Sequence, residues 1–189
     1  MKIKVGVSNR HIHLTEDAYR LLFEKNLTKK NDLSQPGQFS SEEVLTIEAN
    51  GKKIDNVRIV GPFRKYNQVE ISRRDARFLG INPPVRKSGD LKDACDIIIS
   101  NEQGRYKLKD CCIIANRHVH ISNSYAKELR LKDNDEVKIV IPKDKGGIVK
   151  AFIKTSDDAL LELHIDTDDA NAFNLNTGDE VDLILWVLK

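Results

Sequence analysis

Two copies of one short phrase constrain this chain more than any other feature of its sequence. Residues 9–15 read NRHIHLT and residues 116–122 read NRHVHIS, and every mismatch between the two is conservative. A single H-x-H is a weak signal, but two copies that both follow Asn-Arg indicate an internal duplication. We therefore expect a chain with two similar halves.

A second pair of phrases supports the duplication. Residues 68–76 read QVEISRRDA and residues 162–170 read ELHIDTDDA, which sets Glu70 opposite His164. Each half then holds an H-x-H and, later, one more side chain able to bind a metal. The candidate metal ligands, which include all five histidines of the chain, are His11, His13, Glu70, His118, His120 and His164.

These residue types suit a metal ion. Neutral imidazole and carboxylate are common zinc ligands, and a catalytic zinc keeps one position open for water or substrate. Five histidines and one glutamate would fill three protein positions on each of two divalent metals. Iron or cobalt could occupy the same ligands, because affinity alone does not select the metal. The simpler alternative is that these histidines pack in the core or cap helices.

Each ligand phrase also predicts local structure. One aliphatic residue follows the ligand, and then a residue that often caps a helix N-terminus by accepting hydrogen bonds from free backbone N–H groups. These four cap candidates are Thr15, Ser72, Ser122 and Asp166. Strand-like runs lie upstream, at 3–7, 57–60, 112–115 and 160–163. We expect each ligand where a strand ends and a short helix begins, with both histidines of an H-x-H on one strand face.

Turn residues between apolar runs predict three further hairpins, around Asn50-Gly51, Gly104 and Gly146-Gly147. The loop at 28–40 has no counterpart in the second half. The expected fold is mainly β with short α-helices: two similar β-barrel halves from an internal duplication, with the metal site between them. We place the boundary at 110/111, which gives a first half at 1–110 and a second half at 111–189.

Composition limits the compartment and the partners of such a protein. The 189 residues are 40% hydrophobic and 32% charged, an ordinary composition for a soluble protein. No apolar run is long enough for a membrane span, and the N-terminal residues do not resemble a secretory signal. The net charge of +2 argues against wholesale nucleic-acid wrapping. Cys95, Cys111 and Cys112 are an odd number without metal-type spacing, so we expect reduced thiols in a cytoplasmic protein and no thiol nucleophile.

The arginines near the ligand phrases suggest a substrate. Arg64 shortly precedes Glu70, and its forked guanidinium suits a phosphate. Arg64 and Lys65 could equally be a solvated surface pair. Arg10 and Arg117 adjoin the metal histidines, but strand alternation would turn them to the opposite face, so we favour a structural or intersubunit role for these two.

Longer motifs resemble one known family, the PduL-type phosphotransacylases, also called phosphate propanoyltransferases. The resemblance covers nearly the whole chain, from about Lys4 onward, and rests on the phrases GVSNRHIHLT, DLSQPGQF at 32–39, GPFRKYNQVEIS, VRKSGD at 85–90, IIANRHVHIS and LELHIDTDDANA.

The resemblance implies an enzyme that interconverts acyl-CoA plus phosphate with acyl phosphate plus CoA, for short acyl groups such as acetyl or propanoyl. It implies two barrels with a dimetal, usually dizinc, site. Carried over by motif, the six metal ligands are those named above, and Arg64 is the phosphate-binding catalytic residue. The implied partners are small-molecule substrates, not nucleic acid or membrane, and a homodimer is allowed.

Two departures from the family pattern concern geometry and location. Many relatives have Thr where this chain has Asn67, which can still form hydrogen bonds. Microcompartment members carry a targeting helix before the first strand, whereas strand-like residues begin here almost at Met1. We therefore expect a freely cytoplasmic enzyme.

Two other functions would use the same ligands. A dimetal hydrolase would cleave a phosphoester or thioester without needing phosphate as acceptor. A non-catalytic metal-binding or shell-associated scaffold would hold coordinatively saturated metals with no open position.

Overall fold

The computed structural model describes residues 1–185, which form two compact units. The first barrel comprises Asn9–Leu33 and Gly37–Ala115. The second barrel comprises Met1–Ser8, Ser34–Pro36 and the chain from Asn116 onward. Both are mainly β with short helices, so the expected fold class is confirmed. The last four residues of the predicted second half lie outside the described residues.

The first barrel is a ring of six strands in the order β4-β5-β2-β6-β9-β8, which closes because β8 pairs with both β9 and β4. Two short strands extend it, β3 beside β4 and β7 beside β9. Its elements are β2 (His11–His13), α1 (Glu16–Arg20), β3 (Lys29–Asp32), β4 (Phe39–Ala49), β5 (Lys52–Gly61), β6 (Gln68–Glu70), α2 (Arg73–Leu79), β7 (Val85–Arg86), β8 (Cys95–Ser100) and β9 (Arg105–Ala115).

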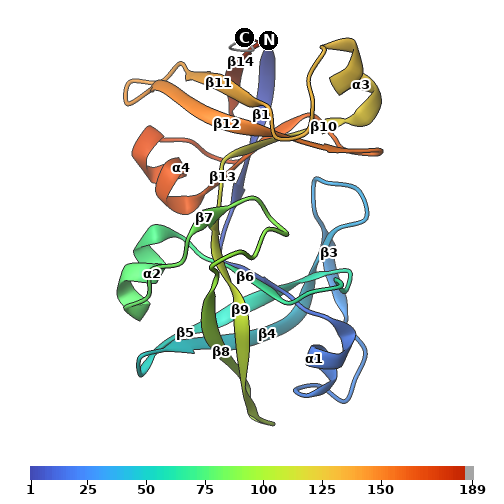
Figure 1. Cartoon of the computed structure of the whole chain (residues 1–189), viewed down its shortest axis with the longest axis vertical. Helices are drawn as coiled ribbons and strands as arrows, with labels where there is room; N and C mark the ends of the chain where they lie inside the picture. Colours follow the sequence, from blue (N-terminus) through green and yellow to red (C-terminus); the bar gives the residue numbers. More distant parts are fainter. Residues whose placement is uncertain (186–189) are drawn as a thin grey trace. The chain divides into compact units, whose positions relative to one another are not determined.

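The second barrel is a closed ring in the order β1-β13-β10-β12-β11-β14. Figure 1 shows dark-blue β1 among the orange and red strands of this barrel, although β1 begins the chain. Its elements are β1 (Lys2–Ser8), β10 (His118–Ser122), α3 (Asn123–Glu128), β11 (Glu136–Ile141), β12 (Gly147–Ser156), β13 (Glu162–Asp166), α4 (Thr167–Phe173) and β14 (Glu180–Ile184).

The two barrels share one pairing pattern. In each, the H-x-H strand runs parallel to one long strand (β5 or β12) and antiparallel to the strand of the third candidate ligand (β6 or β13). That ligand strand then pairs in parallel with β9 in the first barrel and with β1 in the second. The first strand of each sequence repeat therefore belongs to the barrel of the other repeat.

This exchange makes the compact units differ from the sequence halves. The boundary between the sequence halves at 110/111 divides the two repeats along the chain, and it stays a prediction. The compact units instead group Met1–Ser8 with the chain from Asn116 onward, because β1 forms backbone hydrogen bonds with β13 and β14.

Alternating apolar residues build a separate core in each barrel. In β11, Val137, Ile139 and Ile141 are buried, while Glu136 and Lys138 face outward. Buried aliphatic residues dominate both cores, and Tyr19 adds a fully buried ring to the first. Among the described residues, none of the helices is long and apolar enough to cross a membrane.

The predicted hairpins are confirmed: β4 pairs with β5, β8 with β9, and β11 with β12. All four predicted N-caps are confirmed as well, because each cap side chain accepts a hydrogen bond from the backbone N–H three residues later. At α2 the capping box is complete, with Ser72 and Asp75 bonding reciprocally.

The expectation that each ligand lies where a strand ends and a short helix begins is confirmed at Glu70, the last residue of β6, which shortly precedes α2. Two other local expectations were wrong. The strand expected at 160–163 begins at Glu162 and runs through Asp166, so His164 lies inside a strand rather than after one. Part of the loop expected at 28–40 is strand β3, which pairs with the start of β4. Short strands with mixed polarity carry too little periodicity to be read from sequence.

The arginine before each H-x-H has a structural partner. Arg10 donates through Nε and Nη2 to the two carboxylate oxygens of Asp75, at 2.8 and 2.9 Å. Arg117 forms the same forked pair with Asp169, at 2.8 and 2.6 Å. Each acid lies in the first turn of the helix that follows the third candidate ligand. The pair therefore ties the start of the H-x-H strand to that helix.

Candidate metal centres

The first barrel brings three of the six candidate ligands together. His11 and His13 lie on β2, and Glu70 lies on the neighbouring antiparallel strand β6, directly opposite His11. The ligand atoms of the three side chains all lie within 4.8 Å of one another. Two histidines on one strand face and a carboxylate beside them form the three-residue cluster that the H-x-H spacing predicts.

Backbone carbonyls orient the two imidazoles of this cluster. His11 Nδ1 is 2.8 Å from the carbonyl oxygen of Asn9, and His13 Nδ1 is 3.0 Å from that of Val60. Because a carbonyl only accepts, Nδ1 carries the proton in each ring and Nε2 carries the lone pair. Burial lowers the pKa of His13 to about 3, so this ring is neutral and able to bind a metal.

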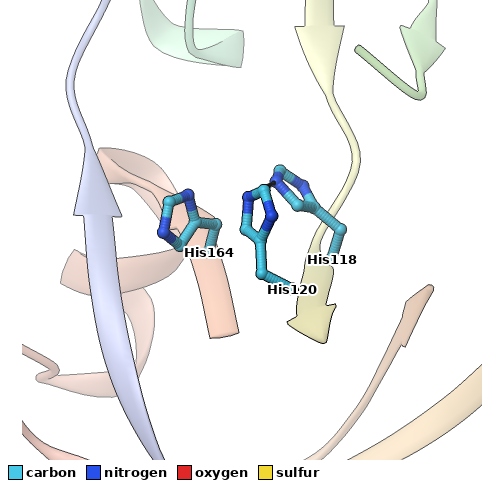
Figure 2. A group of neighbouring side chains, drawn as sticks. All are labelled: His118, His120 and His164. Carbon is cyan, nitrogen blue, oxygen red and sulfur yellow. Dashed lines mark hydrogen bonds between the residues drawn. The ribbon is translucent and has the colours of Figure 1, made fainter. Parts of the chain in front are cut away.

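The second barrel gathers the other three candidates. His118 and His120 lie on β10, and His164 lies on β13, where it pairs directly with His118. Their ligand atoms also lie within 4.8 Å of one another. Figure 2 shows the three rings converging from these two strands. The ring centroid of His120 is 4.8 Å from that of His118 and 4.5 Å from that of His164, which makes His120 the central member.

The nitrogens of this cluster fit a bound cation. His118 Nδ1 donates to the carbonyl of Asn116 at 2.8 Å, so its Nε2 carries the lone pair. That Nε2 is 3.2 Å from Nε2 of His120 in a buried setting. Burial and the neighbouring histidines hold the pKa of His120 far below its usual range, so its ring is neutral. Three imidazoles gathered in this way are a donor set that zinc and related divalent ions accept.

Two residues beside the clusters were not predicted from the sequence. Gln68 donates to Glu70 Oε1 at 2.6 Å, and Glu162 Oε2 is 2.7 Å from His164 Nε2. Burial would raise the pKa of Glu162, but hydrogen bonds from His164, Ser34 and Gln35 outweigh it and lower the pKa to about 2. The aligned repeats QVE and ELH did contain the signal, because they set Gln68 and Glu162 at the same position.

Arg64 lies close to the first cluster. Its backbone N–H donates to the carbonyl of Leu14, next to His13, at 2.8 Å. Its side chain is half-buried, and Nε is buried without a hydrogen-bond partner among the described residues. The Arg64 charge also contributes to the lowered pKa of His13. A cationic donor without a partner beside a candidate metal cluster is well placed to receive an anion.

Comparison with known proteins decides the family. The model of the phosphate propanoyltransferase family matches residues 4–176. The chain belongs to this family. A phosphate propanoyltransferase of Thermotoga maritima is 43% identical over 186 residues, which cover 96% of this chain and 89% of that protein. Those of Lachnoclostridium phytofermentans and Salmonella typhimurium are 41% and 43% identical and cover 96% and 90% of this chain, and 87% and 82% of their own lengths.

Membership of the phosphate propanoyltransferase family confirms the expected enzyme class, a phosphate acyltransferase. Asn67, which stands where many relatives have Thr, still forms a hydrogen bond that supports the local structure. Its Oδ1 accepts from the backbone N–H of Thr15 at 2.9 Å. Thr15 is the N-cap of α1 and follows His13 by two residues. Asn67 thus ties the segment after the H-x-H to the segment before Glu70.

The three cysteines are free thiols, as expected. Cys111 and Cys112 are buried, and burial raises the pKa of Cys111 to about 12 and that of Cys112 further. Thiols with such raised pKa values are not ionised near neutral pH, and the thiolate is the nucleophile. Neither residue therefore suits nucleophilic catalysis in a phosphate propanoyltransferase.

Replacing Cys95, Cys111 and Cys112 together with alanine should leave turnover within about tenfold of the parent. Their main contribution is packing, since a buried cysteine behaves as a small apolar residue. Steady-state rates of folded, metal-loaded protein test this, with circular dichroism as the check on folding. A loss of more than about a thousandfold in well-folded protein would show that a thiol takes part in the reaction.

Proposed function

We propose that this chain interconverts acyl-CoA plus phosphate with acyl phosphate plus CoA, for short acyl groups such as acetyl or propanoyl, with two divalent metal ions. Zinc is the metal that best suits the ligands. His11, His13 and Glu70 would hold one ion, and His118, His120 and His164 the other. The carrying observation is that all six residues gather into two three-residue clusters, each with ligand atoms within 4.8 Å. The relatives named phosphate propanoyltransferase support the acyl and phosphate chemistry.

The proposed reaction is a direct transfer. A phosphate oxygen attacks the thioester carbonyl carbon, the carbon–oxygen bond forms, and the carbon–sulfur bond breaks with the electron pair leaving on the CoA sulfur. A divalent ion held by either three-residue cluster would supply Lewis acidity, which favours charge on the carbonyl oxygen and on a leaving thiolate. No covalent enzyme intermediate is needed, so much of the rate would come from orienting the two substrates.

The residues of the chain itself have two roles in this scheme. Arg64 would bind the phosphate through its planar guanidinium group. This contact would neutralise part of the phosphate charge and aim a phosphate oxygen at the carbonyl carbon. The carbonyls of Asn9, Val60 and Asn116 hold three of the histidines with Nε2 unprotonated, so that no ring has to rearrange before it binds a metal.

Initial rates of CoA release test the proposed function. Acetyl-, propanoyl- and butanoyl-CoA should each be assayed with and without phosphate, using zinc-loaded protein. We expect release that depends on phosphate and yields one acyl phosphate for each CoA. Release that is independent of phosphate and yields free acid would instead identify a dimetal thioester hydrolase. The three substrates also rank the acyl-chain preference in the same experiment.

A further inference from the structure

The third candidate ligand of each cluster contacts the residue two positions before it on the same strand. In the first barrel that residue is Gln68, and in the second it is Glu162. The two contacts have opposite polarity. An amide N–H donates to the carboxylate of Glu70, whereas a carboxylate accepts from the imidazole of His164. Each neighbour therefore has the chemistry that its own ligand requires.

The contact with Glu162 determines which nitrogen of His164 can bind a metal. Oε2 of Glu162 already accepts hydrogen bonds from the Ser34 hydroxyl and the Gln35 amide, so it is an acceptor toward His164 too, and Nε2 of His164 carries the proton. The lone pair then lies on Nδ1. This is the reverse of His11, His13 and His118, whose Nδ1 atoms are the ones that contact backbone carbonyls. His164 is thus oriented through its other edge.

Ser34 and Gln35 hold Glu162 in turn. Ser34 donates its hydroxyl to Glu162 Oε2, and Gln35 Nε2 lies 3.2 Å from the same oxygen. Gln35 is only 4% exposed, and its amide also bonds to both the carbonyl and the N–H of Leu160, at 3.2 Å each. These bonds explain why Ser34–Pro36, part of the segment without a counterpart in the second repeat, belongs to the second barrel.

Gly6 provides the space for this pair. It lies on β1 directly opposite His164. A Cβ at Gly6 would lie 2.9 Å from Cδ2 of His164, 3.0 Å from its Nε2 and 3.1 Å from the carboxyl carbon of Glu162. Any side chain there would push the ring or the carboxylate from its place. The equivalent register position in the first barrel, opposite Glu70, is occupied by Ile113.

We propose that Glu162 is a positioning residue: held by Ser34 and Gln35, it fixes His164 with Nε2 protonated and presents Nδ1 to the metal of the second barrel. Gln68, which is anchored by Ser88 and the N–H of Gly89, likewise holds Oε1 of Glu70 in the first barrel. This inference rests on the proposed two-metal function. Partners of this kind typically change metal affinity by about 10- to 100-fold.

Zinc affinity of single variants tests the proposal. Competition with a chelator should show that Glu162→Ala lowers the affinity for one of the two zinc ions by about 10- to 100-fold and leaves the affinity for the other unchanged. Glu162→Gln should fall between parent and Glu162→Ala, because its amide oxygen still accepts from Nε2 without the charge. Gln68→Ala should instead lower the affinity for the zinc ion of the first barrel. Glu136→Ala, an exposed glutamate on β11, is the matched control.

The outcomes distinguish a failure of the positioning role of Glu162 from a failure of the proposed two-metal function. If Glu162→Ala leaves both zinc affinities unchanged, Glu162 does not position His164. If Glu162→Gln loses the ion as completely as Glu162→Ala, Glu162 is a ligand and the proposal is also wrong. If the parent binds no zinc, the two-metal function itself fails.

The protonated nitrogen of each histidine can also be measured directly in the parent protein, so this test does not depend on whether a variant folds. Long-range proton–nitrogen correlation spectra of zinc-loaded, ¹⁵N-labelled protein report which nitrogen of each histidine is protonated. We expect Nε2 to be protonated in His164 and Nδ1 in His11, His13 and His118. A His164 ring protonated at Nδ1 in the zinc-loaded protein would overturn the proposal.

Discussion

Replacing His120 with alanine should lower turnover by about a thousandfold or more and reduce the metal content from two ions per chain to one. His120 is buried, neutral and central among the three histidines of its cluster. A Lewis-acid metal contributes several kcal/mol of transition-state stabilisation, and each 1.36 kcal/mol corresponds to a factor of about ten. Elemental analysis of untagged protein after zinc reconstitution, with steady-state rates, measures both effects.

Lys138→Ala is a suitable control for this variant, since Lys138 is exposed on β11 of the same barrel and lies outside the cluster. Thermal unfolding of both variants without metal separates loss of the ion from loss of the fold. Two metals bound to folded His120→Ala protein, or fewer than one bound to the reconstituted parent, would contradict the proposed centres.

Replacing Arg64 with alanine should lower kcat/KM for phosphate by about ten- to a hundredfold and leave the metal content unchanged. A hydrogen bond to a charged group is worth roughly 1.5–3 kcal/mol, which corresponds to that range. Arg64→Lys should recover only part of the loss, because an ammonium cannot reproduce the planar fork. Initial rates against phosphate concentration measure the effect.

Lys65 supplies the matched control, because it is the adjacent cation and its side chain is exposed. Lys65→Ala should change kcat/KM for phosphate by less than about twofold. If Arg64→Ala behaves like Lys65→Ala, the two residues are a solvated surface pair and Arg64 does not bind phosphate.

The parts that were predictable from the sequence depend on local chemistry. A cap such as Ser72 or Asp166 acts within three residues, so the starts of the four helices could be read directly. The grouping of His11 with His13 follows from strand alternation alone. The third member of each cluster, Glu70 or His164, was found because the duplication supplied an alignment within a single chain.

The parts that were missed depend on pairing between distant segments. No local pattern shows that β1 pairs with β13 rather than with strands of its own repeat, because a strand edge accepts any partner of suitable register. Glu162 was missed for a related reason. Its partners Ser34 and Gln35 lie far away along the chain, in a segment that the repeats do not align.

The exchanged first strands mean that no single cut separates the two barrels. Cleavage between Ser8 and Asn9 frees β1 but leaves β9 joined to β10, and cleavage between Ala115 and Asn116 leaves β1 joined to β2. Each six-stranded ring is therefore completed by a strand from the other sequence repeat: β9 completes the first ring and β1 completes the second.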